Sequence, residues 1–158
     1  FVVTVINFLQ QNADWEHTAV IIAYDDSDGW YDHQVGPIVN QSSTDADAYC
    51  KGTPALAGPG TNGKPAQGRC GYGPRLPMLV VSPWAKQNYV DHTITDQTSI
   101  IHFIEDNWLK GERIGGGSFD SIAHSITGML DFKHANKKTL ILDPDTGEPT
   151  GGTSVSGR

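Results

Sequence analysis

The feature that most constrains the fold is a short, unbroken apolar segment that ends in two adjacent carboxylates. Residues 18–24 read Thr-Ala-Val-Ile-Ile-Ala-Tyr, and Asp25 and Asp26 follow them directly. Apolar runs of this length, rich in β-branched residues and without polar alternation, are typical of strands covered on both faces, as in a parallel sheet. A second run of the same kind spans residues 78–82. We therefore expect two buried strands.

Helical periodicity is found on both sides of these strands. The apolar residues at the start of the chain recur at helical spacing and predict a helix from Val2 to about Asn12. Residues 91–109 predict a turn followed by a helix, with Thr95 or Asp96 as its N-cap. Further along, another helix is expected from Asp120 and a short strand at residues 140–142.

The order of these elements indicates the fold class. Helix, strand, long loop, strand, helix and helix predict an α/β architecture, in which flanking helices pack on a mostly parallel sheet. Two strands alone make a poor sheet. The rest of the sheet is therefore expected elsewhere, in a missing N-terminal portion or in a partner chain.

The segment between the two strands lacks clear periodicity. Residues 36–77 hold most of the 9 prolines of the chain and many of its 18 glycines. This composition predicts a long irregular loop that serves as a lid or a rim. Cys50 and Cys70 both fall in this loop, so the preferred interpretation is a disulfide that closes it in an oxidising compartment. The alternative is two free thiols in a cytosolic protein.

Charge and hydropathy exclude two classes of partner. The 158 residues carry a formal net charge of −7 at pH 7. Nucleic-acid backbones would be repelled, so no nucleic acid is expected as a partner. An anionic substrate would need a metal ion or a cluster of basic side chains. No apolar run approaches the length of a membrane-spanning helix, so no transmembrane segment is expected.

The densest polar cluster, residues 25–33, directly follows the first predicted strand. In open α/β sheets, ligands bind beyond the C-terminal ends of the strands. Adjacent carboxylates repel each other unless a cation neutralises them, and hard divalent metals prefer oxygen ligands. Asp25 and Asp26 are therefore the candidate metal ligands. Asp28 fits a metal ligand and a simple Asp-Gly turn equally well, whereas Trp30 and Tyr31 are interpreted as packing residues.

Two histidines remain open between functional and structural roles. His33 lies in the acidic cluster, where it would donate to a carboxylate, bind the metal or pack structurally. His92 lies near the predicted helix start at residues 95–99, and a helix N-terminus can assist an anion. We prefer a capping role for Asp96 in this second region and leave His92 as either a supporting or a packing residue.

Several blocks, taken in chain order, resemble one protein family. They are residues 20–33, 75–84, 90–93, 96–105 and 129–132. Together they resemble the strand-and-metal region of bacterial phosphoesterases that include non-haemolytic phospholipases C and acid phosphatases, in the alkaline-phosphatase-like superfamily. The resemblance covers residues 1–133.

The resemblance implies both a fold and a chemistry. Residues 1–133 would form the C-terminal part of an alkaline-phosphatase-like phosphoesterase domain, and residues 134–158 a partly disordered extension. It implies metal-assisted attack on phosphorus, with Asp25 and Asp26 matching the family's carboxylate ligands of a divalent metal ion. The family's Ser or Thr nucleophile and an early Glu-Asn ligand pair lie upstream, and no block here matches them. We therefore expect a fragment of a secreted or periplasmic protein.

These observations leave two functions open. The first is a phosphoric ester hydrolase of acid phosphatase or phospholipase C type, acting on phosphomonoesters or phospholipid head groups. In that case this chain pairs with the missing N-terminal half, and the two halves together bind the phosphate-ester substrate. In this chain alone, the metal ion is expected to be weakly bound or absent. The alternative is a catalytically inactive binding module that self-associates, because an incomplete sheet exposes its edges.

Overall fold

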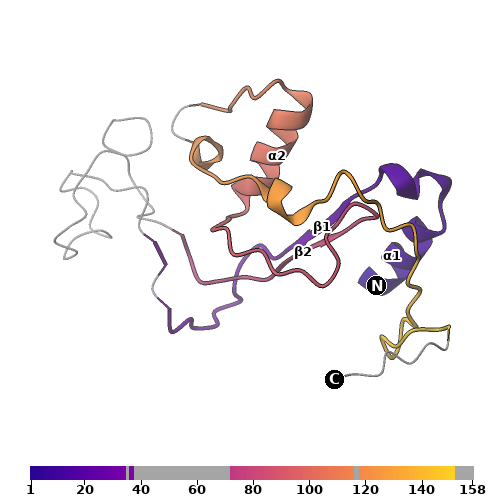
Figure 1. Cartoon of the computed structure of the whole chain (residues 1–158). Helices are drawn as coiled ribbons and strands as arrows, with labels where there is room; N and C mark the ends of the chain where they lie inside the picture. Colours follow the sequence, from indigo (N-terminus) through magenta and orange to yellow (C-terminus); the bar gives the residue numbers. More distant parts are fainter. Residues whose placement is uncertain (35, 38–71, 116–117, 152–158) are drawn as a thin grey trace, which may run out of the picture. The chain divides into compact units, whose positions relative to one another are not determined.

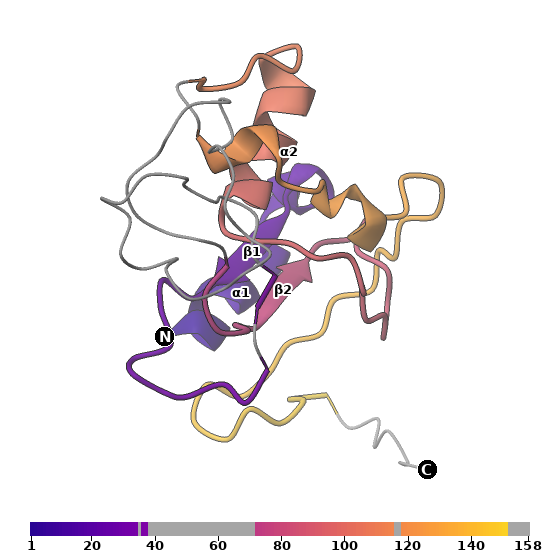
Figure 2. The same cartoon turned by 90° about the vertical axis from the view of Figure 1, so that its left-hand side faces the viewer.

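The computed structural model describes residues 1–34, 36–37, 72–115 and 118–151. Figures 1 and 2 show the chain coloured along its sequence in two views. The described residues belong to two compact units, each built from segments that are distant in sequence. The first unit combines Phe1–Ile22, Leu79–Val90 and Met129–Arg158, and the second combines Ala23–Met78 and Asp91–Gly128. Most of the predicted loop, with the disulfide predicted between Cys50 and Cys70, lies outside the described residues.

The first unit begins with helix α1, Val2–Gln10, and the 3-10 helix η1, Ala13–His17. α1 ends before the predicted Asn12 because this side chain starts the next element instead. It accepts the Asp14 N–H at 2.9 Å and so caps η1. Among the described residues of this unit, Trp15 and Leu130 are the buried apolar side chains.

The two apolar runs form the strands β1, Val20–Ala23, and β2, Met78–Val81, which pair in a two-stranded sheet (Figure 1). The strands run antiparallel. Ser82, just after β2, donates its hydroxyl to the carbonyl of Thr18, just before β1, at 2.8 Å. The prediction of a mostly parallel sheet is therefore wrong for these strands. An apolar run locates a strand but does not encode its direction, and neither strand is fully buried in the described chain.

In the first unit, the C-terminal segment is bound to α1 by side-chain amides. Asn7, 9% exposed, donates to the Leu142 carbonyl at 2.6 Å and accepts the Leu142 N–H at 3.1 Å. Gln10 binds both backbone groups of Leu140 in the same way, at 2.9 and 2.8 Å. Instead of the predicted strand at residues 140–142, the described chain has a segment that pairs with helix side chains, plus an isolated Leu142–Pro149 bridge.

Helix α2, Thr98–Trp108, is the main element of the second unit. Its start is held by a reciprocal cap. The Asp96 side chain accepts the N–H groups of Thr98 and Ser99 at 2.8 and 3.2 Å, and the Ser99 hydroxyl accepts the Asp96 N–H at 3.1 Å. Ser99 is fully buried, so the cap is fixed in place. The structure thus gives Asp96 the predicted capping role.

The helix predicted from Asp120 is replaced by two 3-10 helices, η3, Phe119–Ser121, and η4, Ile126–Met129. Asp120 does not cap a helix because its groups bind elsewhere. Its carboxylate accepts the Ile114 N–H at 3.0 Å, and its carbonyl binds His102 Nδ1 at 2.8 Å. Among the described helices, none is both long and apolar enough to cross a membrane.

Candidate functional site

The acidic pair comes directly after β1, in the second unit. Asp25 and Asp26 are both exposed. The last two carbonyls before Asp26, those of Tyr24 and Asp25, accept from Gln97 Nε2 at 2.8 and 2.6 Å. The start of α2 is therefore bound to the end of β1. This brings the backbone that carries the pair next to the N-terminus of α2, where the partial positive charge of a helix favours anions.

A tight turn follows the pair. The Trp30 N–H donates to the Ser27 carbonyl at 2.9 Å, and the Asp28 N–H donates to the Asp26 carboxylate. Asp28 has φ +49° and Gly29 has φ +81°, so both central residues of the turn are left-handed. Asp and Gly are the residues that tolerate this backbone. The turn interpretation of Asp28 therefore fits the structure.

A fourth carboxylate of the cluster has a role that the sequence did not indicate. Asp32 forms a two-pronged ion pair with Arg75, with oxygen–nitrogen distances of 2.8 and 2.9 Å. It also accepts the backbone N–H of Arg75 at 2.9 Å and that of Gln34 at 3.0 Å. The Arg75 side chain, then these backbone N–H groups, hold the pKa of Asp32 well below its usual range. Arg75 lies in one of the blocks that resemble the family, residues 75–84, and this position was the signal in the sequence that could have identified it.

Both histidines proposed as supporting residues are exposed. The His33 ring stands edge-on to Tyr31, with ring centroids 5.1 Å apart. His92 lies in the segment before the α2 cap. The expectation that Trp30 and Tyr31 are packing residues is wrong in the described chain, because they are 80% and 81% exposed.

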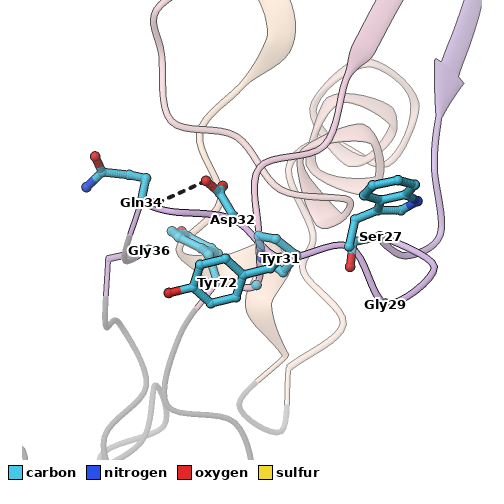
Figure 3. Close-up of a pocket in the computed structure, with 10 residues that line it drawn as sticks. Ser27, Gly29, Tyr31, Asp32, Gln34, Gly36 and Tyr72 are labelled. Carbon is cyan, nitrogen blue, oxygen red and sulfur yellow. Dashed lines mark hydrogen bonds between the residues drawn. The ribbon is translucent and has the colours of Figure 1, made fainter.

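A shallow cavity of about 380 Å³ lies along the segment after the turn (Figure 3). Tyr31, Asp32 and Tyr72 are among its lining residues. Gly36 also lines it, and a Cβ there would approach the Tyr72 carbonyl to 2.8 Å, so glycine is required for this close contact. Burial, and secondarily the charge of Asp96, raise the pKa of Tyr72.

A polar network holds the far part of α2. Arg113 donates to Glu105 at 3.0 Å, to Asp106 at 2.6 Å and to His102 Nε2 at 3.0 Å. His102 Nδ1 lies 2.8 Å from the Asp120 carbonyl, which can only accept, so this nitrogen carries the proton. His102 Nε2 also lies 3.2 Å from the Asp106 carboxylate. The hydrogen bond from Arg113 is the main cause that lowers the pKa of Asp106.

The donor chemistry of the acidic pair suits a hard divalent metal, which prefers carboxylate oxygens. The number of donors is smaller than a complete site needs. Across residues 1–34, 36–37, 72–115 and 118–151, no group of three or more His, Cys, Asp or Glu side chains could hold a metal ion. Asp25 and Asp26 therefore fit part of a metal site, and its other ligands would come from elsewhere.

Comparison with known proteins places this region in a family. The model of the Phosphoesterase family matches residues 1–109. Non-hemolytic phospholipase C of Burkholderia pseudomallei is 38% identical over 114 residues, which cover 66% of this chain and 15% of that protein. Non-hemolytic phospholipase C of Pseudomonas aeruginosa is 29% identical over 148 residues, 91% of this chain and 21% of that protein.

A mycobacterial relative gives the same picture. Phospholipase C B of Mycobacterium tuberculosis is 32% identical over 96 residues, 61% of this chain and 18% of that protein. The chain thus spans 15% to 21% of the length of these curated relatives.

Proposed function

Because this chain belongs to the phosphoesterase family, we propose that it carries part of the metal site of a phosphoric ester hydrolase of the phospholipase C type. The observation that carries the proposal is the exposed Asp25–Asp26 pair at the end of β1, inside the matched region 1–109. The binding of Gln97 to the carbonyls behind this pair brings a helix N-terminus to the same place.

Within this function, Asp25 and Asp26 would hold a divalent metal ion with their carboxylate oxygens. Such an ion neutralises charge on the phosphate oxygens and activates the attacking oxygen. The net charge of −7 on these 158 residues repels an anionic ester, and a bound metal ion would offset this repulsion locally. The nucleophile and the remaining metal ligands are expected in other parts of the full polypeptide.

The relatives favour a phosphodiester substrate. Those described above are named phospholipases C, so we infer that the bond cleaved joins a phosphorylated head group to a lipid. The competing possibility within the same chemistry is an acid phosphatase that removes a phosphomonoester. The two differ in whether the second phosphate oxygen carries a substituent, which a pair of chromogenic esters can report.

The test uses the natural gene product that contains these residues, assayed with p-nitrophenylphosphorylcholine as the diester and p-nitrophenyl phosphate as the monoester. We expect faster hydrolysis of the diester. Asp25→Asn or Asp26→Asn should lower kcat by at least roughly 100-fold, because a lost ligand removes charge stabilisation made mainly in the transition state. The 158-residue chain alone should hydrolyse neither ester.

Asp28→Asn is the matched control, since it makes the same chemical change within the same acidic cluster. Asn tolerates the left-handed backbone of Asp28, so this variant should stay close to wild-type turnover. Equal losses for Asp28→Asn and Asp25→Asn would refute the roles assigned within the cluster. Wild-type turnover in Asp25→Asn and Asp26→Asn would refute the hydrolase proposal.

A second function, a self-associating module without catalysis, is favoured by one observation. Large apolar side chains of α1, including Phe8 at 66% exposure, are uncovered in the described chain. Apolar helix faces of this kind mark interaction sites.

We further propose that the protein is exported and that Cys50 and Cys70 form a disulfide. Both cysteines lie in one Gly- and Pro-rich segment, and an oxidising compartment would keep them paired. Intact-mass measurement after alkylation, with and without reductant, tests this. Alkylation of both thiols in the unreduced native protein would reject the disulfide and weaken the case for export.

A further inference from the structure

One side chain outside the acidic cluster fixes the backbone from which the two carboxylates extend. We propose that Gln97 is a positioning residue for the Asp25–Asp26 pair. This inference rests on the proposed metal-binding role of the pair and assigns the group that orients it. Gln97 would not touch the metal or the substrate.

The contact uses the full donor capacity of one nitrogen. Gln97 Nε2 lies 2.8 Å from the Tyr24 carbonyl and 2.6 Å from the Asp25 carbonyl. A side-chain amide nitrogen carries two hydrogens, so each carbonyl can receive one of them. These carbonyls lie beyond the end of β1 at Ala23, where the strand ladder no longer holds the backbone. The amide takes over this task.

Holding two successive carbonyls restricts the direction of the side chains that follow. Each carbonyl belongs to a planar peptide unit, and the two units on either side of the Asp25 Cα are the ones that Gln97 binds. Fixing both planes fixes φ and ψ of Asp25, and therefore the direction of its Cβ. The second plane also contains the backbone nitrogen of Asp26, whose carboxylate additionally accepts the Asp28 N–H.

Gln97 is itself held firmly. It lies between Asp96 and Thr98, inside the reciprocal cap whose Ser99 is fully buried. At the other end of α2, Glu105 and Asp106 are bound by Arg113. Side-chain contacts therefore hold both ends of α2 in place. The Gln97 amide joins the backbone after β1 to this fixed helix.

A neutral donor is well suited to this position. A lysine or arginine there would place a positive charge beside two carboxylates and compete with a cation for them. The amide also occupies two carbonyl oxygens that a hard cation could otherwise bind. Gln97 thereby leaves the carboxylates as the available ligands at this strand end.

The test compares Gln97→Glu and Gln97→Met with the wild type in the natural gene product. Both variants keep the side-chain length and favour helix, but neither can donate to the carbonyls. A glutamate directly before α2 is favoured by the helix dipole, so the helix itself should not be destabilised. In metal-free protein, hydrogen–deuterium exchange should be faster in peptides covering residues 24–30 of both variants.

Metal affinity supplies the second readout. Titration with Mn²⁺ should show affinity lowered about tenfold or more, as is usual when a partner that orients metal ligands is removed. With p-nitrophenylphosphorylcholine, kcat at limiting Mn²⁺ should fall while KM for the ester changes little. Saturating Mn²⁺ should restore kcat, which a merely structural defect would not allow.

Gln10→Glu is the matched control. It makes the same change in a helical glutamine that also binds a backbone carbonyl, that of Leu140. Exchange should change near residue 140, with no effect on Mn²⁺ affinity. Unchanged exchange at residues 24–30, or unchanged Mn²⁺ affinity, in both Gln97 variants would overturn the inference.

Asp25→Asn, titrated in parallel, separates this inference from the proposed function. If it weakens Mn²⁺ binding while the Gln97 variants do not, the positioning role alone is wrong. If Asp25→Asn leaves Mn²⁺ affinity unchanged, the proposed metal site is wrong and Gln97 has no ligand to position.

Discussion

At the scale of single residues, Asp32 shows how one carboxylate can organise a segment. It receives two hydrogen bonds from the Arg75 side chain and one from the Arg75 backbone, across 43 residues of sequence. The charged form of the carboxylate is the one that accepts all of them. Because its pKa is lowered in the folded protein, folding is favoured as long as Asp32 is ionised.

Asp32→Asn should therefore lower the melting temperature at neutral pH. The sign follows from the depressed folded-state pKa: the stabilisation is fully present above the unfolded-state pKa of about 3.9 and is lost as the pH falls below it. The difference in melting temperature between wild type and variant should be largest at pH 6–7 and shrink toward pH 2–3. Thermal unfolding followed by circular dichroism over this pH range measures it.

Asp14→Asn is the control, because Asp14 is an exposed carboxylate in η1 that forms no such ion pair with any of the described residues. It should change the melting temperature little at any pH. A constant difference between wild type and Asp32→Asn from pH 7 down to pH 2 would show that the ion pair does not carry the effect.

At the scale of elements, α1 is more than an apolar surface for packing. Asn7 and Gln10 lie on successive turns of α1. Each side-chain amide donates one hydrogen bond to the backbone of residues 140–142 and accepts one from it, as a neighbouring β-strand would. This arrangement satisfies backbone groups that no regular ladder satisfies. The C-terminal segment is thereby joined to the first helix of the chain.

Asn7→Ala should destabilise the protein by about 2 kcal/mol, because it leaves the carbonyl and the N–H of Leu142 without these partners. Urea unfolding of the variant and the wild type measures the change. Gln11→Ala is the control, since Gln11 is the exposed C-cap residue of α1 and its side chain donates to the Asn7 carbonyl of the same helix. Equal destabilisation by the two substitutions would contradict the role given to Asn7.

The elements also show which interactions the sequence encodes locally. The strand positions follow from unbroken apolar runs, and the cap of α2 joins residues three apart, so both could be predicted. The antiparallel direction of β1 and β2 could not, because their apolar runs look the same in either direction. The contacts of Gln97 with Asp25 and of Arg75 with Asp32 span 72 and 43 residues and depend on tertiary packing.

At the scale of the whole molecule, both helices present uncovered apolar side chains in the described chain. On α1 and its N-cap these include Phe1, Val5 and Phe8, and on α2 they are Ile101, Ile104 and Trp108. Each set follows helical spacing and so forms one stripe. The hydrolase proposal expects other parts of a longer polypeptide to cover these stripes, whereas the alternative expects a second copy of the chain to cover them.

The 158-residue chain expressed alone should therefore self-associate. Light scattering after size exclusion should give a mass above the monomer's 17.1 kDa at micromolar concentration, because exposed apolar stripes favour burial against another copy. Phe8→Lys should shift the species toward the monomer, because it places a charge within the apolar stripe of α1. A wild-type chain that is monomeric and fully folded at all concentrations would contradict this prediction. The same substitution in the full gene product separates the two functions: if the longer polypeptide covers α1, Phe8→Lys lowers its melting temperature without changing its mass, and if self-association is the function, it lowers the mass.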